Sequence, residues 1–169
     1  MNRPLLLATA IAATLLLSAC QPGQGEDEAQ QQAEAVPVAP ASDDDAAWKA
    51  YLGQVISQNM DGITERTFNY YLPAGVDPAE PEGPYSRMKT DVSNALLRTV
   101  LPGNMLTFSS PNSTLMADLV VAAFSTEGVR EDALRGTRVL FIGEAKDEER
   151  VRQAALAVGA EFRFVEVRR

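Results

Sequence analysis

The chain has no histidine, only one cysteine and a net charge of −8, and each shortage excludes a class of function. Without histidine, neither a Ser-His-Asp nor a Cys-His catalytic group can form, and nearly all zinc sites are excluded too. The single cysteine, Cys20, cannot form a disulfide within the chain, so the fold must be stable without one. Any enzyme chemistry would depend on carboxylates, lysine, tyrosine, serine or a hard metal ion. We therefore favour a non-catalytic protein over an enzyme, and we expect no cofactor or metal.

Acidic residues outnumber basic residues by 23 to 15, but the excess lies near the amino terminus. Residues 21–45 contain seven acids and no base, whereas residues 46–169 contain 16 acids and 14 bases. The part of the chain that is apolar enough to fold is therefore nearly neutral. Binding to a nucleic-acid backbone needs a basic stripe or patch, which this distribution does not provide. We expect no nucleic acid among the partners.

The first residues have the composition of a secretory signal peptide. Arg3 is followed by an apolar run that is too short to span a bilayer. The run ends in the motif Leu-Ser-Ala-Cys, whose cysteine is Cys20, and this motif resembles the lipobox of bacterial lipoproteins. The resemblance covers residues 1–20 only. It implies cleavage before Cys20, attachment of diacylglycerol to the Cys20 thiol, and acylation of the new amino terminus with a fatty acid such as palmitate.

The resemblance also implies a location and a division of the chain. A protein processed in this way is held in the bacterial cell envelope by its lipid, and Gln21 implies sorting to the outer membrane, with the protein facing the periplasm. Residues 20–45 are rich in Gln, Ala, Pro, Gly and acids, a composition too polar to form a core. We expect a signal peptide over residues 1–19, a disordered tether over residues 20–45, and one globular domain over residues 46–169.

Periodic apolar residues predict an α/β domain. In its C-terminal half, strands alternate with helices, which implies parallel pairing through right-handed crossovers. We expect a small three-stranded parallel βαβαβ sheet, covered on its other face by two N-terminal helices. Residues 64–72 fit either an extended segment or helical turns, and we favour the extended form. The predicted helices cover residues 44–58, 85–100, 113–124 and 146–158, and the predicted strands cover residues 105–109, 137–142 and 161–167.

Two loops are candidate ligand sites, because ligands of open parallel sheets bind beyond the carboxyl ends of the strands. The first loop begins a helix, where hydroxyls and free backbone N–H groups suit a phosphate, sulfate or carboxylate. The second follows the central strand and suits a polar or cationic ligand or a hard metal ion. Helix caps and an ordinary turn are the favoured interpretation, because no Gly-rich motif is present. The candidate residues are Ser109, Ser110, Asn112, Ser113 and Thr114 in the first loop and Glu144, Lys146 and Asp147 in the second.

These observations favour a non-catalytic protein-interaction module that is anchored to the membrane through Cys20 and binds another envelope protein. One alternative is a small-ligand or anion-binding protein, or an enzyme, that uses the loops at residues 109–114 and 143–147. Another is a scaffold or immunity-type lipoprotein linked to a secretion apparatus. The Pro-rich stretch over residues 73–84 has neighbouring tyrosines and suits a contact surface, although packing of the rings in the core is favoured.

Overall fold

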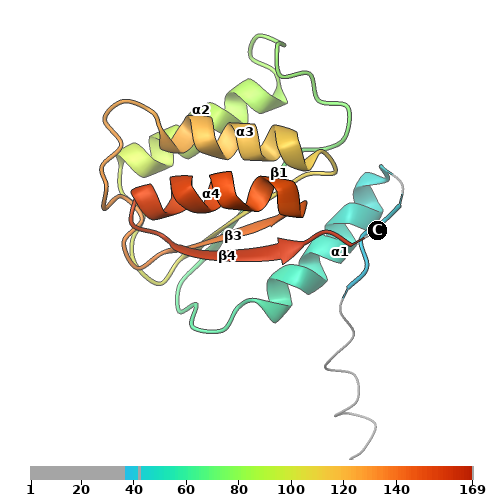
Figure 1. Cartoon of the computed structure of the whole chain (residues 1–169), viewed down its shortest axis with the longest axis horizontal. Helices are drawn as coiled ribbons and strands as arrows, with labels where there is room; N and C mark the ends of the chain where they lie inside the picture. Colours follow the sequence, from blue (N-terminus) through green and yellow to red (C-terminus); the bar gives the residue numbers. More distant parts are fainter. Residues whose placement is uncertain (1–36, 42, 169) are drawn as a thin grey trace, which may run out of the picture. The chain divides into compact units, whose positions relative to one another are not determined.

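A computed structural model describes residues 37–41 and 43–168 of the chain (Figure 1). The signal peptide, Cys20 and most of the expected tether lie outside these residues. No helix in the described part of the chain is both long enough and apolar enough to cross a membrane. In chain order the described elements are α1 (Asp45–Gln58), β1 (Thr67–Tyr71), α2 (Pro84–Leu97), β2 (Met105–Ser109), α3 (Ser113–Phe124), β3 (Arg138–Gly143), α4 (Ala145–Ala157) and β4 (Glu161–Glu166).

The strands form one parallel sheet in the order β1-β2-β3-β4. Thr67 of β1 lies opposite Met105, Met105 lies opposite Arg138, and Arg138 lies opposite Glu161. The expected α/β class with parallel pairing is confirmed, and so is the extended form of residues 67–71. The expected number of three strands is wrong, because β1 pairs with β2 and adds a fourth strand at the edge of the sheet.

The helices cover the two faces of the sheet unequally. The three crossover helices α2, α3 and α4 pack on one face, over core residues such as Phe108 and Phe141 (Figure 1). Helix α1 packs on the opposite face, where Trp48 and Leu52 meet Leu140 of β3. The expectation that both N-terminal helices share one face is therefore wrong for α2. Because α2 connects two neighbouring parallel strands, right-handed crossovers place it on the same face as α3 and α4.

Local chemistry accounts for the ends of the helices. The Ala47 N–H donates to Asp44 Oδ1 at 2.7 Å, so Asp44 caps the start of α1. Helix α2 begins at Pro84, a position where a backbone N–H would have no partner within the helix. The expected end of α2 at residue 100 is wrong, because the helix ends at Leu97. Thr99 has a φ of 68°, a left-handed conformation that the helix cannot continue through.

The chain enters the domain beside its own C-terminal end. Ala39 is buried, and its N–H donates to the carbonyl oxygen of Arg168 at 3.1 Å. Ala39 belongs to the same core cluster as Trp48 of α1. Packing of the chain on the domain thus begins before residue 46, where composition places the start of the domain. Composition could not show this packing, because it depends on one backbone hydrogen bond and one buried alanine.

Candidate functional site

The two predicted loops lie next to each other at the carboxyl ends of β2 and β3. Residues 110–112 lead from β2 into α3, and Glu144 joins β3 to α4. Both loops line a shallow, polar depression of about 310 Å³, to which Asp43 also contributes. Ser109 lies beneath the surface, and its carbonyl oxygen accepts from the Leu72 N–H at 3.1 Å. The fold therefore brings the predicted residues together, and their contacts decide what they can do.

Asp147 is the centre of a hydrogen-bond network that joins the two loops. The residue is 3% exposed, and its Oδ2 accepts from Ser113 Oγ at 2.7 Å and from Thr114 Oγ1 at 3.2 Å. Its Oδ1 accepts from Arg150 Nη2 at 2.7 Å and from Arg150 Nε at 3.1 Å. Ser113 Oγ in turn accepts from the Glu144 N–H at 2.8 Å. These donors are engaged in holding α3 and α4 together.

The network also sets the charge of Asp147. Burial raises the pKa of this carboxyl group, but hydrogen bonds from Ser113, Arg150 and Thr114 outweigh burial and hold the pKa below its ordinary value of 3.8. Arg150 pairs with Asp118 of α3 as well as with Asp147. A carboxylate that is charged and already paired is a poor general base and a poor metal ligand. In the described part of the chain, no group of three or more metal-ligating side chains is placed to hold a metal ion.

The remaining predicted side chains have local partners. The Leu115 N–H donates to Asn112 Oδ1 at 3.1 Å, so Asn112 caps α3, and the Asn112 N–H donates to Ser110 Oγ at 3.0 Å. Lys146 Nζ lies 2.7 Å from Glu144 Oε2, and the hydrogen bond to Glu144 raises the pKa of Lys146. Helix caps and a strand-to-helix turn account for these contacts. A ligand site at these loops stays a prediction.

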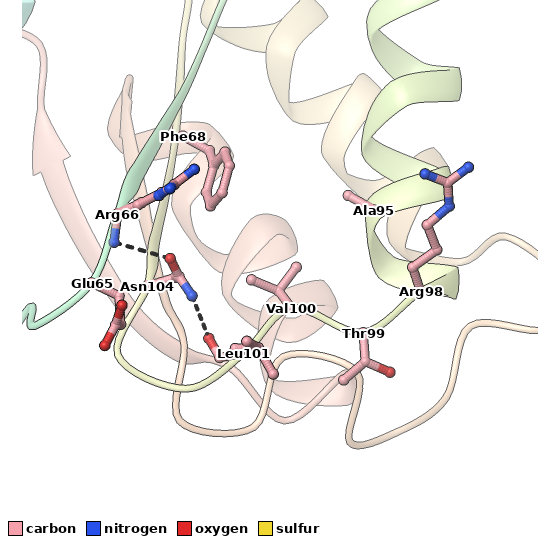
Figure 2. Close-up of a pocket in the computed structure, with 9 residues that line it drawn as sticks. All are labelled: Glu65, Arg66, Phe68, Ala95, Arg98, Thr99, Val100, Leu101 and Asn104. Atoms are coloured by element: carbon pink, nitrogen blue, oxygen red, sulfur yellow. Dashed lines mark hydrogen bonds between the residues drawn. The ribbon is translucent and has the colours of Figure 1, made fainter.

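A second surface, at the edge of β1, was not predicted from the sequence. A pocket of about 480 Å³ lies between the start of β1 and the end of α2, and Figure 2 shows its lining. The side chains come from three segments: the β1 side supplies Glu65, Arg66 and Phe68, α2 supplies Ala95, and the residues after α2 supply Arg98, Thr99, Val100, Leu101 and Asn104.

Asn104 fixes the shape of this pocket. Its side chain is buried, with Oδ1 accepting from the Arg66 N–H at 3.0 Å and Nδ2 donating to the carbonyl oxygen of Leu101 at 2.7 Å (Figure 2). The carbonyl oxygen of Gly103 accepts from the Glu65 N–H at 3.1 Å. Gly103 has a φ of 84°, and a Cβ at this position would collide with Thr64. The approach to β1 is therefore fastened to the loop that follows α2.

Exposed apolar side chains gather around the pocket. Phe68 and Leu101 line it and are 41% and 72% exposed. Arg66 and Arg98 lie on opposite walls of the pocket (Figure 2). Neither guanidinium group forms an ion pair with a carboxylate among residues 37–41 and 43–168. An apolar surface flanked by unpaired arginines is typical of a site that contacts another protein.

A smaller pocket of about 290 Å³ lies on the opposite face of β1, between the strand and α1. Gly53 leaves the α1 wall open, because nothing lies within 4 Å of the place that a Cβ would take. On the floor, Thr107 Oγ1 donates to Asn69 Oδ1 at 2.8 Å. Burial and the neighbouring Asp45 raise the pKa of Tyr71, which keeps this phenol neutral. The lining consists of Lys49, Leu52, Gly53, Ile56, Asn69, Tyr71, Thr107 and Ser109.

Two surfaces are therefore candidates for the functional site. At the strand-end depression, the buried carboxylate and hydroxyl groups are bonded to one another. At the β1 edge, large apolar side chains are exposed and two arginines have no carboxylate partner among the described residues. Comparison of the chain with protein-family models, with curated proteins and with solved structures found no match.

Proposed function

We propose that this protein is a non-catalytic interaction module, held in the outer membrane by lipid on Cys20, that binds another envelope protein in the periplasm. The observation that carries the proposal is the pair of exposed apolar side chains, Phe68 and Leu101, that line the pocket between the start of β1 and the end of α2. Folded proteins rarely expose large apolar side chains in a group unless a partner covers them. Arg66 and Arg98 beside this pair favour a partner surface that carries acidic side chains.

Photocrosslinking in the producing bacterium tests this surface. A photoreactive phenylalanine analogue at Leu101 should give a discrete adduct with one protein, because Leu101 is the more exposed side chain of the pair. Leu156 on α4 is the matched control, since it is also a leucine, is 56% exposed and does not line the pocket. Adducts of equal yield at both positions, or no adduct at Leu101, would contradict the proposed surface.

The lipid anchor is tested separately. Cys20→Ala should abolish incorporation of labelled palmitate, because the proposed processing starts at the Cys20 thiol. Metabolic labelling followed by electrophoresis of the purified chain measures this incorporation. The neighbouring substitution Gln21→Ala leaves the thiol in place and should keep the label. Labelling that persists in the Cys20→Ala variant would contradict the proposed lipid anchor.

A further inference from the structure

Strand β1 is an edge strand whose outer side is unpaired in the described residues. The Met105 N–H donates to the carbonyl oxygen of Arg66 at 2.9 Å, and the Leu72 N–H donates to β2 at 3.1 Å. Since backbone groups of successive residues alternate in direction along a strand, Thr67, Asn69 and Tyr71 direct theirs away from β2. Strand β1 has β2 as its one neighbour in the sheet. Its outer N–H and C=O groups are therefore available for another strand.

The two edges of the sheet differ in charge. Strand β4, at the opposite edge, carries Glu161, Arg163 and Glu166, and charged side chains on an edge oppose pairing with another chain. The chain segment at Ala39 also pairs just beyond β4. Strand β1 has the sequence TFNYY, with no charged residue and no proline. Of the two edges, β1 is the one that can accept a further strand.

The two pockets beside β1 lie on opposite faces of the sheet. The pocket of about 480 Å³ is lined by Phe68, and the pocket of about 290 Å³ is lined by Asn69 and Tyr71. Successive side chains of a strand point to opposite faces, so Phe68 and Asn69 belong to different faces. A strand added beside β1 would for the same reason direct alternate side chains into the two pockets. Backbone pairing and side-chain sites thus coincide at this edge.

Charge at the pockets defines the chemistry of the added strand. Arg66 and Arg98 of the larger pocket have no ion pair among the described residues, and Glu65 is the one acid in its lining. In the smaller pocket, Lys49 is paired with Asp45 at 2.5 Å. The larger pocket therefore favours acidic side chains beside its apolar lining, and the smaller pocket favours apolar or uncharged side chains.

We propose that β1 binds an extended, acidic and apolar segment of the partner protein as a fifth strand of the sheet. Main-chain hydrogen bonds from Thr67, Asn69 and Tyr71 hold the segment, and the two pockets select its alternate side chains. This proposal rests on the proposed function, because it specifies how the same surface meets its partner.

Peptide selection tests the strand. The full-length protein in detergent is panned against a random display library of linear peptides about ten residues long. We expect enriched peptides in which Asp or Glu recurs at every second position beside apolar residues, with micromolar affinity. Adding an enriched peptide should slow amide hydrogen exchange at Thr67, Asn69 and Tyr71, whose N–H groups point outward. Failure to enrich such peptides, or unchanged exchange in β1, would overturn strand addition.

A pair of substitutions separates backbone pairing from side-chain contact. Thr67→Pro removes one outward N–H at the first residue of an edge strand, where proline is tolerated, and should weaken peptide binding about tenfold. Thr67→Val is the matched control, because it removes the same hydroxyl but keeps the N–H, and binding should be unchanged. Equal affinities of the two variants would refute strand addition. Crosslinking at Leu101 that persists in that case leaves the proposed function standing, with a partner that docks through side chains alone.

Discussion

Replacing Asp147 with alanine should lower the free energy of unfolding by roughly 2–4 kcal/mol. The substitution leaves Ser113 Oγ, Thr114 Oγ1 and the Arg150 guanidinium without their shared acceptor between α3 and α4. Urea denaturation of the full-length protein, followed by circular dichroism, measures the loss. Glu149→Ala is the control, because Glu149 lies in the same helix but is exposed, and its removal should change stability by less than about 0.5 kcal/mol.

A small effect of Asp147→Ala would contradict the structural role of this carboxylate. It would mean that the hydrogen bonds across the two loops contribute little to the free energy of unfolding. The favoured interpretation of these loops, helix caps and an ordinary turn, would then lose its main support.

The same carboxylate predicts how stability depends on pH. The pKa of Asp147 is lower in the folded protein than its ordinary value of 3.8, so on acidification the unfolded chain takes up a proton first. The stabilisation that Asp147 contributes is complete well above pH 3.8. It is lost as the pH falls through the lower pKa that Asp147 has in the folded protein. The parent protein and Asp147→Ala should therefore converge in unfolding free energy below about pH 4. A constant difference down to pH values near 2 would contradict the lowered pKa.

Replacing Trp48 with alanine should cost about 3–5 kcal/mol of unfolding free energy. Trp48 is fully buried, meets the Tyr51 ring edge-to-face at 5.7 Å, and packs α1 on the sheet face that carries Leu140 and Ile142. The cavity left by the indole would loosen the layer that α1 forms. Because Trp48 is the one tryptophan of the chain, circular dichroism rather than fluorescence should follow unfolding.

A graded series provides the control for Trp48. Trp48→Phe keeps an aromatic ring in the site and should cost clearly less than Trp48→Ala, since it leaves a smaller cavity. Equal costs for the two variants, or a cost below about 1 kcal/mol for alanine, would show that α1 contributes little to holding the sheet.

The sequence predicts best where an element is buried and bounded by turn residues. Strand β2 and helix α3 have the predicted bounds, Met105–Ser109 and Ser113–Phe124, because their apolar runs are continuous and Asn112 caps the helix. Strand β1 is half-exposed, and its identity depends on pairing with β2, which local sequence does not encode. The error in the face covered by α2 follows from this one missing strand, because a helix between two parallel strands has its face fixed by the crossover.

The two candidate sites also differ in how far the sequence predicts them. The strand-end rule correctly places Ser113 and Asp147 side by side, but residues 34 apart in sequence give no sign that they bond to each other. At the β1 edge, Phe68 and Leu101 line one pocket because Asn104 hydrogen-bonds to both segments. One sequence signal pointed to the β1 edge: the strand TFNYY carries no charge, whereas the strand EFRFVE at the other edge is charged.

The hydrogen bond between Ala39 and Arg168 has a consequence for stoichiometry. It places the entry of the chain beside β4, about 14 Å from β1 at the usual spacing between strands. A sheet with two open edges can be extended in both directions, and identical copies can then join end to end. With β4 charged and the chain entering beside it, the sheet can be extended on one side only. If a partner strand binds at β1 as proposed, we expect a one-to-one complex and no filament.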